Sequence, residues 1–208
     1  MVATPPEPKT LSGRLVRLEP FRASDADELA ELVLDPRLHE HGFVMYPPPR
    51  SYAEALRRVY SAWAATPAAH ASRVTWVVRL TGDGDLGPAG TLVGASSLGE
   101  AEPENEAVHL GWTVYGRRWW GSLVNAETKY LLLREAFENL GFGRVRLQTD
   151  ALNLRSQAAI EKLGATKEGV LRRHKVRADG TFRDTVVYSI LRDEWPAVKA
   201  GLERRLSA

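Results

Sequence analysis

The chain has 208 residues, a formal net charge of +2 and no cysteine. This length allows one domain that buries a core without cross-links, and the absence of cysteine excludes disulfide frameworks, thiolate zinc sites and cysteine nucleophiles. The polar, proline-rich start does not resemble a secretory signal, and no apolar run approaches a membrane span. We therefore expect a cytoplasmic protein without membrane contact.

The N-terminal third predicts a tail, a strand and two helices. Residues 1–12 read as a flexible tail, and the alternation in residues 13–21 predicts the first strand. Ser24 is the expected N-cap of a first helix that ends near Asp35, and Ser51 opens a second helix. The connection between the helices is rich in His, Pro and aromatic residues, so we expect it to line a specificity pocket.

The middle of the chain predicts three strands. Residues 73–80 and 89–98 flank a turn-forming cluster and are expected to pair antiparallel. Residues 100–106 carry four glutamates and read as an exposed loop, either a solvated turn or an acidic rim for an amine. In residues 107–115 apolar and polar positions alternate, which predicts a central strand. One face is expected to carry Val108, Leu110, Trp112 and Val114, and the other His109, Gly111, Thr113 and Tyr115.

A basic turn with two glycines follows the central strand and leads into a long helix. Residues 126–140 have helical apolar spacing, and Gly141 is the expected terminator. A Ser or Asn of the turn could cap the helix, whose start would attract an anion such as phosphate. An ordinary turn with exposed arginines is the equal alternative. The spacing of Gly116 and Gly121 matches neither common nucleotide-binding fingerprint.

The rest of the chain predicts a strand, a short helix, a hairpin and a closing helix. Residues 144–150 alternate and should run parallel to the central strand after the helical crossover. Asn153 and Gly164 are the expected N-cap and terminator of the short helix. The hairpin, around an Asp-Gly turn, and the closing helix are predicted over residues 168–177, 181–191 and 195–206.

This order of features resembles the GNAT superfamily of acyl-CoA-dependent N-acyltransferases, and most of all its ribosomal-protein-alanine N-acetyltransferase branch. The features are a basic turn before a long helix, a parallel strand, an Asn-x-x-Ser helix ending in EKLGA, then EGVLRRH and the Asp-Gly hairpin. The resemblance implies an α+β (mixed α/β) domain over residues 13–195, with 1–12 as a tail and 196–208 as a helical extension. It also implies a mostly antiparallel mixed sheet of about seven strands, with one splayed parallel pair and helices on both faces.

The resemblance further implies acetyl-CoA as co-substrate, with its pyrophosphate on residues 120–125. Leu123 stands where the family has its first glycine, and Asn125 where Gly or Ala is usual. Either the loop has another shape that leaves its amides free, which its basic residues and Asn125 favour, or CoA binding is weaker. The expected cofactor contacts are Trp112, Thr113 and Val114 along the pantetheine arm, Trp119, Trp120, Gly121, Ser122, Leu123, Val124 and Asn125 at the pyrophosphate, and Asn153 and Ser156 near the sulfur.

Ser156 and His109 are the candidate acid and base. Ser156 shares a helical face with Ala159, Ile160 and Leu163, which points its hydroxyl inward. In the resembling branch this Ser hydrogen-bonds the CoA sulfur and could protonate the thiolate, while Ile160 replaces the Tyr of many relatives. The alternative is a hydroxyl that bonds back to a helix carbonyl.

The base is less narrowly defined. His109 could accept an ammonium proton directly or through water, or be purely structural, and Glu106 and Asp184 are rivals. A protein N-terminus, with a reference pKa of about 7.7 to 8.0, would need no strong base. A backbone N–H near Val114 could donate to the thioester carbonyl. His39 and His41 lack further spaced ligands, so we expect no metal site.

The leading hypothesis is an acetyl-CoA-dependent N-acetyltransferase that acts on a primary amine, either a protein N-terminus or a small amine, by direct attack in a ternary complex. One alternative is a CoA-binding module without activity. Another is a ribosome- or nucleic-acid-associated protein, although its basic residues more often form a solvated strand face. That face would comprise Arg172, Arg173, His174, Lys175 and Arg177. Nucleic acid is not the expected partner, and the chain could form a homodimer.

Overall fold

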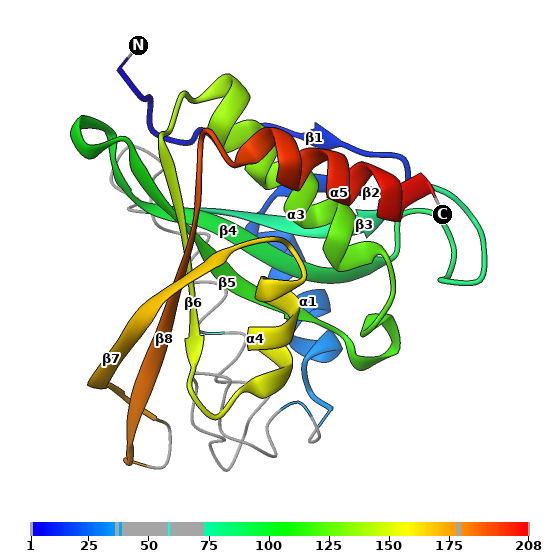
Figure 1. Cartoon of the computed structure of the whole chain (residues 1–208). Coiled ribbons are helices and arrows are strands. Elements are labelled where there is room, and N and C mark those ends of the chain that lie inside the picture. The colour runs from blue at the N-terminus through cyan, green and yellow to red at the C-terminus, as the bar shows by residue number, and fades with distance from the viewer. Residues whose placement is uncertain (1, 36–37, 39–57, 59–72, 178–179, 208) are drawn as a thin grey trace.

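The computed structural model describes residues 2–35, 38, 58, 73–177 and 180–207. Within them one sheet has eight strands in the order β1-β2-β3-β4-β5-β6-β8-β7 (Figure 1). Every neighbouring pair is antiparallel except β5 and β6, which are parallel. The strands are β1 (Leu11–Ser12), β2 (Val16–Pro20), β3 (Arg73–Leu80), β4 (Leu92–Glu102), β5 (Ala107–Tyr115), β6 (Arg144–Asp150), β7 (Thr166–Val176) and β8 (Phe182–Leu191).

The expected mixed sheet with one parallel pair is confirmed, and so are the two predicted antiparallel hairpins. The strand beyond the predicted seven is β1, which pairs with β2 within the segment expected to be a tail. The alpha helices are α1 (Ala26–Leu32), α3 (Val124–Arg134), α4 (Leu154–Glu161) and α5 (Trp195–Ser207), and a π-helical stretch, η5 (Glu135–Asn139), continues α3. Among the described residues no helix is both long and apolar enough to cross a membrane.

Helices cover both faces of the sheet. Helices α3 and α5 lie side by side on one face (Figure 1), where they share a core with Trp76 and Val78 of β3. Helix α1 packs on the opposite face, where Leu29 contacts a smaller cluster that includes Val77. The alternation of buried side chains along β3 therefore divides the apolar interior into two layers, here called the α3 face and the α1 face.

Residues 2–12 contact the folded domain. Ala3 is only 2% exposed, and the backbone N–H of Thr4 donates to the carbonyl of Leu140 at 2.9 Å. The carbonyl of Lys9 accepts the indole N–H of the buried Trp76 at 2.7 Å. The segment is too short and too polar to show hydrophobic periodicity, so the sequence carried no sign of these contacts.

The carboxylate of Glu127, inside α3, holds the turn between β1 and β2. It accepts the backbone N–H groups of Arg14, Leu15 and Val16 at 2.9, 2.7 and 2.6 Å, although its own residue is only 5% exposed. A buried carboxylate needs such donors because burial without hydrogen bonds is costly. An added Cβ on Gly13 would lie 2.6 Å from this carboxyl group, so the turn requires glycine there.

The first predicted helix differs from the expectation. Ser24 is not the N-cap, because residues Ala23–Asp25 form a 3-10 turn and Asp25 directly precedes α1. The Asp25 carboxylate instead accepts the backbone N–H of Arg22 at 2.8 Å. The helix ends at Leu32, three residues before the expected Asp35. The second predicted helix and the connection before it lie outside the described residues, apart from Leu38 and Arg58.

The predicted terminators of the later helices and the predicted cap of α4 are confirmed. Gly141 and Gly164 have φ values of +75° and +96°, which favour glycine, and the Asn153 side chain accepts the backbone N–H of Ser156 at 3.0 Å. The glutamate-rich stretch is only partly a loop. Strand β4 continues to Glu102, and Glu100 is a half-buried strand residue with a φ of +48°.

The central strand β5 contains a bulge that breaks its predicted alternation. Ala95 pairs with Val114 and Ser97 with Gly111, so Trp112 and Thr113 both oppose Ser96, and Trp112 has a φ of +49°. One extra residue shifts the pleat, as bulges do. Val108 and Leu110 lie in the core under α3, whereas Val114 packs on the α1 cluster. The expectation that the four apolar residues share one face is therefore wrong.

Candidate active site

The parallel strands β5 and β6 separate part of the way along their length. Their paired residues are Ala107 with Arg144, Val108 with Val145 and His109 with Arg146. Beyond His109, β5 continues to Tyr115 and β6 to Asp150 without pairing to each other. The expected splayed pair is thus present. An edge of β5 that β6 no longer covers can bind an extended ligand by backbone hydrogen bonds.

The three residues expected along the pantetheine arm lie on this separated stretch and point in different directions. The ring of Trp112 lies on the α1 face, 4.6 Å from the ring of His109, with the Arg73 guanidinium 4.9 Å from its centroid. Thr113 is exposed and contacts the α3 face, while Val114 is half-buried against the α1 cluster. Because of the bulge, consecutive residues on the unpaired edge of β5 contact both the α3 face and the α1 face.

The basic turn forms a rigid support for the start of α3. The indole N–H of Trp119 donates to the carbonyl of Leu86 at 2.9 Å, and that of Trp120 to the carbonyl of Tyr115 at 3.1 Å. The Ser122 hydroxyl donates to the carbonyl of Trp119 at 2.6 Å. Trp119 is 9% exposed and Val124 is fully buried, so their side chains belong to the core. Any ligand contact from these two residues would come from the backbone.

Neither Ser nor Asn occupies the N-cap position of helix α3, although the Ser122 hydroxyl accepts the backbone N–H of Val124 at 3.3 Å. The N-cap position is Leu123, and Asn125 is the second residue of the helix, half-buried. Gly121 has a φ of +77°, and an added Cβ there would have no heavy atom within 4 Å, so the space beside the turn is open. This open space next to a helix start whose N-cap residue, Leu123, makes no side-chain cap is compatible with a phosphate group, despite the absence of the family's glycine at that position.

Helix α4 reaches the same place from the other side of the separated strands. The guanidinium of Arg155 lies 3.4 Å from the ring centroid of Trp120, a close cation–π contact. This brings the first turn of α4, with Asn153 and Ser156, next to the turn that precedes α3. Arg155 was not among the residues predicted from the sequence, because its partner Trp120 is far away in the chain and no local pattern reveals the contact.

Ser156 lies on the half-buried side of α4, as predicted. Ser156 and Ala159 are half-buried, Ile160 is 8% exposed and Leu163 is 5% exposed. Asn153 is fixed by capping this helix, which leaves its amide N–H₂ group for another partner. Ser156 thus lies on the less exposed side of α4, and the direction of its hydroxyl and its role as an acid stay predictions.

His109 is buried in a charged surrounding. Its side chain is 4% exposed, and its Nδ1 lies 3.4 Å from the carboxylate of Glu100, which also binds the guanidinium of Arg146. Neither ring nitrogen has a hydrogen-bond partner among the described residues. Burial, followed by the positive charge of Arg146, lowers the pKa of His109 to about 3. The imidazole is therefore neutral near pH 7, but it is a weak proton acceptor.

The rivals for the base occupy other parts of the fold. Glu106 precedes β5, at the end where β5 and β6 are paired, and contacts Arg192 at 3.2 Å. Asp184 accepts the backbone N–H of Arg173 at 2.7 Å within the β7–β8 hairpin. His39 and His41 lie outside the described residues. Within the described part of the chain no group of three or more His, Asp or Glu residues could hold a metal ion.

Lys129 is a second residue that the sequence analysis missed. It lies on α3, is 6% exposed, and its Nζ donates to the hydroxyl of Thr113 at 2.5 Å and to that of Ser96 at 3.0 Å. Lys129, Leu132, Leu133 and Ala136 have helical offsets of 0, 3, 4 and 7. A lysine at the first position of an otherwise apolar face was the available signal, because lysine is rarely buried.

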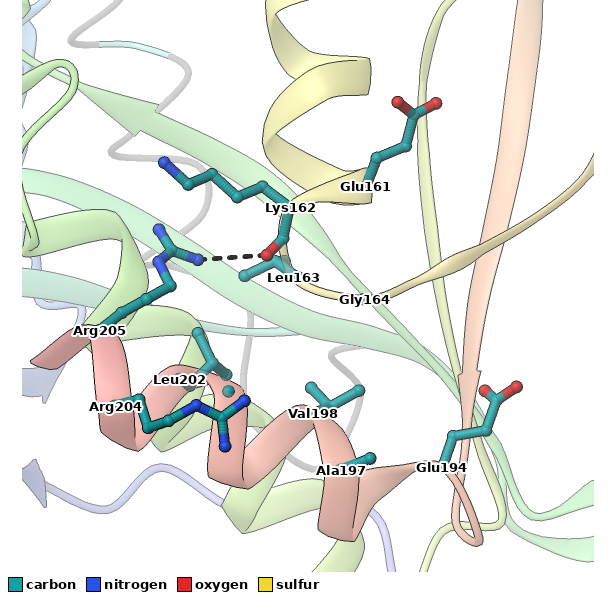
Figure 2. Close-up of a pocket in the computed structure, with 11 residues that line it drawn as sticks. Glu161, Lys162, Leu163, Gly164, Glu194, Ala197, Val198, Leu202, Arg204 and Arg205 are labelled. Carbon is teal, nitrogen blue, oxygen red and sulfur yellow. Dashed lines mark hydrogen bonds between the residues drawn. The ribbon is translucent and has the colours of Figure 1, made fainter.

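A shallow groove lies at the other end of α4. It has a volume of about 730 Å³ and is formed by the end of α4 and by α5, with Leu163, Val198 and Leu202 among its lining residues. Figure 2 shows Arg205 reaching across to the carbonyl of Lys162, at 3.3 Å. Asn153 and Ser156 are at the start of α4, whereas this groove is at its end, so the two sites are separate.

Comparisons with known proteins agree with this arrangement. Residues 15–166 match the acetyltransferase (GNAT) domain family. A Bacillus subtilis (strain 168) protein named "Putative ribosomal N-acetyltransferase YdaF" is 29% identical over 110 residues, which are 53% of this chain and 59% of that protein. The match thus spans less than two thirds of that relative.

Solved structures match over nearly the whole chain. The crystal structure of a protein from T. thermophilus, named as a "putative acetyltransferase", is 40% identical, with a TM-score of 0.82 and coverage of 98% of this chain and 100% of that one. Mycobacterium smegmatis RimJ, solved with CoA-disulfide, has a TM-score of 0.77 at 20% identity and 95% coverage of each chain, which shows a shared fold. The resemblance noted from the sequence, including that to the ribosomal-protein N-acetyltransferases, is confirmed, and the chain belongs to the GNAT acetyltransferase family.

Proposed function

We propose that the protein is an acetyl-CoA-dependent N-acetyltransferase that acetylates a primary amine, either a protein N-terminus or a small amine. The observation that carries this proposal is the separation of β5 from β6 after His109 and Arg146. The open edge of β5 leads from the bulge at Trp112 toward the start of α3, and the start of α4 approaches the same region through Arg155. An extended acyl thioester with an anionic end fits this shape and charge.

The residues at the separated strands divide into two groups. Exposed Arg117 and Arg118, together with Arg155 and the N–H groups at the start of α3, would hold the pyrophosphate. The backbone of Thr113 and Val114 would pair with the pantetheine arm, and an N–H at the bulge would donate to the thioester carbonyl as it gains negative charge. Acetyl-CoA supplies an activated acetyl group, and the amine attacks it directly in a ternary complex. Ser156 would donate a proton to the departing thiolate.

The amine would reach the thioester at the open edge beside the bulge, where Trp112, His109 and Glu100 come from the α1 face and the Thr113 hydroxyl comes from the α3 face. A ribosomal-protein N-terminus is the first acceptor to test, because the name of the Bacillus relative points to a ribosomal substrate. An N-terminal amine, with a reference pKa of about 7.7 to 8.0, is partly neutral at pH 7, unlike a lysine side chain near 10.4. Small amines remain the other acceptor class.

The experiment is acetyl-CoA turnover with a panel of N-terminal peptides, small amines and aminoglycosides. Release of the free thiol and the mass of the acetylated product are measured together, and peptides with a blocked N-terminus are the matched controls. We expect thiol release that depends on a free amine. A protein that is stabilised by CoA but releases no thiol with any of the amines would instead be an inactive CoA-binding module. The departures from the family pattern at Leu123 and Asn125 also allow that alternative.

The nucleic-acid alternative has weaker support. In the basic stretch of β7, Arg177 makes two hydrogen bonds to the Asp150 carboxylate, His174 contacts Thr185, and Arg173 lies over the ring of Phe182. These side chains have partners within the fold. Binding to RNA or DNA that weakens steeply with salt would favour this alternative, whereas no binding at low salt would reject it.

A further inference from the structure

Lys129 has an environment that is unusual for a lysine. Its Nζ, the hydroxyl of Ser96 and the hydroxyl of Thr113 are mutually within 3.0 Å and form a small polar triangle beneath the sheet. Ser96 is fully buried, and Lys129 itself is 6% exposed. Among the described residues no carboxylate forms an ion pair with Lys129. A buried unpaired lysine destabilises a fold relative to an apolar residue, so its presence calls for a role.

Thr113 connects this buried amine to the separated strands. The bulge at Trp112 returns Thr113 to the α3 face, where its hydroxyl is 2.5 Å from Nζ of Lys129. Thr113 is nevertheless an exposed residue, and it lies on the part of β5 that no longer pairs with β6. Its hydroxyl group thus borders both the buried lysine and the edge where the proposed function places the thioester carbonyl.

We propose that Thr113 and Lys129 accept the proton of the acetyl transfer, with the Thr113 hydroxyl as the group that meets the attacking amine. This inference rests on the proposed function and deepens it. The pair takes the place of His109 as the candidate base. The His109 imidazole is neutral near pH 7, but its pKa of about 3 makes it too weak a base to accept the amine proton. Lys129 acts only through Thr113, because its own side chain is enclosed.

The proton and electron balance of the step is complete. The amine nitrogen forms a bond to the carbonyl carbon, the carbon–sulfur bond breaks, and its electron pair stays on sulfur. The amine proton passes to the Thr113 oxygen while the hydroxyl proton passes to neutral Nζ of Lys129, which becomes an ammonium group. Water, or Ser156 that then regains a proton from solvent, protonates the thiolate, and Lys129 later releases its proton to solvent, so the net products are the amide and free CoA.

The charge state of Lys129 is compatible with this role. Burial lowers the pKa of Lys129 to about 7, so a large fraction of the amine is neutral near neutral pH. The titratable groups nearest in the chain on the α3 face are Glu127 on α3, which is held by the β1–β2 turn, and Tyr115 on β5, whereas Glu100 on β4, His109 on β5 and Arg146 on β6 lie on the opposite, α1 face. His109 and Tyr115 keep one protonation state near pH 7, since burial lowers the pKa of His109 to about 3 and raises that of Tyr115 above its ordinary value.

The experiment compares pH–rate profiles of the wild type, Lys129→Met and Thr113→Val. Both substitutions nearly keep the side-chain volume, and both remove the path for the proton. Thr128→Val is the matched control, because it removes a fully buried hydroxyl from the neighbouring residue of α3 that is not part of the polar triangle. The acceptor is a small amine with a reference pKa of about 10.4, so its own ionisation lies well above the range of interest.

For the wild type we expect kcat/KM to rise more steeply below pH of about 7 than above it. Two protons must leave below that value, one from Lys129 and one from the amine, and only one above it. Lys129→Met and Thr113→Val should each lower kcat by about 10² or more and should lose the steeper limb. Thr128→Val should keep both the rate and the profile.

Three further readings decide the outcome. The melting temperature and the shift caused by CoA check that each variant folds and still binds the cofactor. An NMR titration of the Lys129 side chain should give a pKa of about 7 in the wild type and in Thr113→Val. If Lys129→Met or Thr113→Val keeps the wild-type rate and the steeper pH dependence below a pH of about 7, the inference is wrong but the proposed acetyltransferase function stands. If the wild type transfers acetyl to no amine, both the proposed function and the inference are wrong.

Discussion

The backbone N–H of Val16 donates to the carboxylate of Glu127 at 2.6 Å, which joins β2 to α3 across 111 residues of chain. The same carboxylate accepts the N–H groups of Arg14 and Leu15. Helix α3 carries both the start of the proposed pyrophosphate site and Lys129. The Glu127 contact therefore fixes the helix on which the site depends to the first strands of the sheet.

Glu127→Gln should lower the free energy of unfolding by about 3 kcal/mol, because the amide N–H₂ would face backbone donors that are then left unsatisfied in a buried position. Urea unfolding with a fixed m-value measures the change. The exposed Glu104→Gln is the control and should stay within about 0.5 kcal/mol of the wild type. Equal midpoints for the two variants would show that the carboxylate does not anchor this turn.

Asn125→Asp should weaken the thermal stabilisation by CoA far more than Asn125→Ala does. Asn125 is the second residue of α3, so the aspartate would place a negative charge against the pyrophosphate, whereas alanine removes only one amide donor. A ligand that binds only the native state raises the melting temperature by mass action, so the shift reports affinity. The same CoA shift in wild type and Asn125→Asp would place the pyrophosphate away from this helix start.

Ser156→Ala should lower kcat by about 10² and change the apparent KM for acetyl-CoA much less, because the donated proton is needed only as the carbon–sulfur bond breaks. If Ser156 only fills the helix face, alanine should leave turnover nearly unchanged and could stabilise α4. Turnover and melting temperature are measured on the same two proteins. Unchanged turnover in the alanine variant would reject Ser156 as the acid.

His109 should make the protein sensitive to mild acid. Its pKa is lowered to about 3 in the folded state against about 6.5 unfolded, so between these values the unfolded chain binds more protons. Stability from the neutral imidazole is therefore present above a pH of about 6.5 and is lost as the pH falls toward the folded pKa. Within a pH range of about 6.5 to 4 the slope of unfolding free energy against pH should exceed that of His109→Leu by up to about 1.4 kcal/mol per pH unit.

Denaturant unfolding at a series of pH values tests this slope. The exposed His174→Gln variant is the control: burial also lowers the pKa of His174, but this residue is far less buried than His109, so its removal should change the slope much less. Parallel pH profiles for the wild type and His109→Leu would mean that the imidazole can be protonated in the folded state without penalty.

Local signals in the sequence predicted most of the fold. Gly141, Asn153 and Gly164 end or begin helices through their own backbone and side-chain geometry, which a short window contains. The parallel pair β5 and β6 followed from a strand, a helix and a strand in succession. Strand β1 escaped prediction because two residues, Leu11 and Ser12, cannot show a period.

The candidate site was predictable in outline and not in its details. The family resemblance directed attention to Ser156 and to the turn before α3, but the pairing of Arg155 with Trp120 and of Lys129 with Thr113 arises only when distant segments meet. The bulge could not be foreseen because the extra residue is defined by its partner, Ser96, on another strand. His109 was named as a base from its residue type, and only its burial shows how weak a base it is.

The bulge at Trp112 also divides β5 into two halves, in which odd-numbered and even-numbered side chains exchange faces of the sheet. Before it, odd-numbered side chains such as His109 lie on the α1 face; after it, even-numbered ones such as Val114 do. Substitutions at His109 and Val114 should therefore both perturb the α1 layer, whereas a substitution at Thr113 should perturb the α3 layer. A strand with this reversal brings side chains from both layers to the one edge where the amine and the thioester would meet.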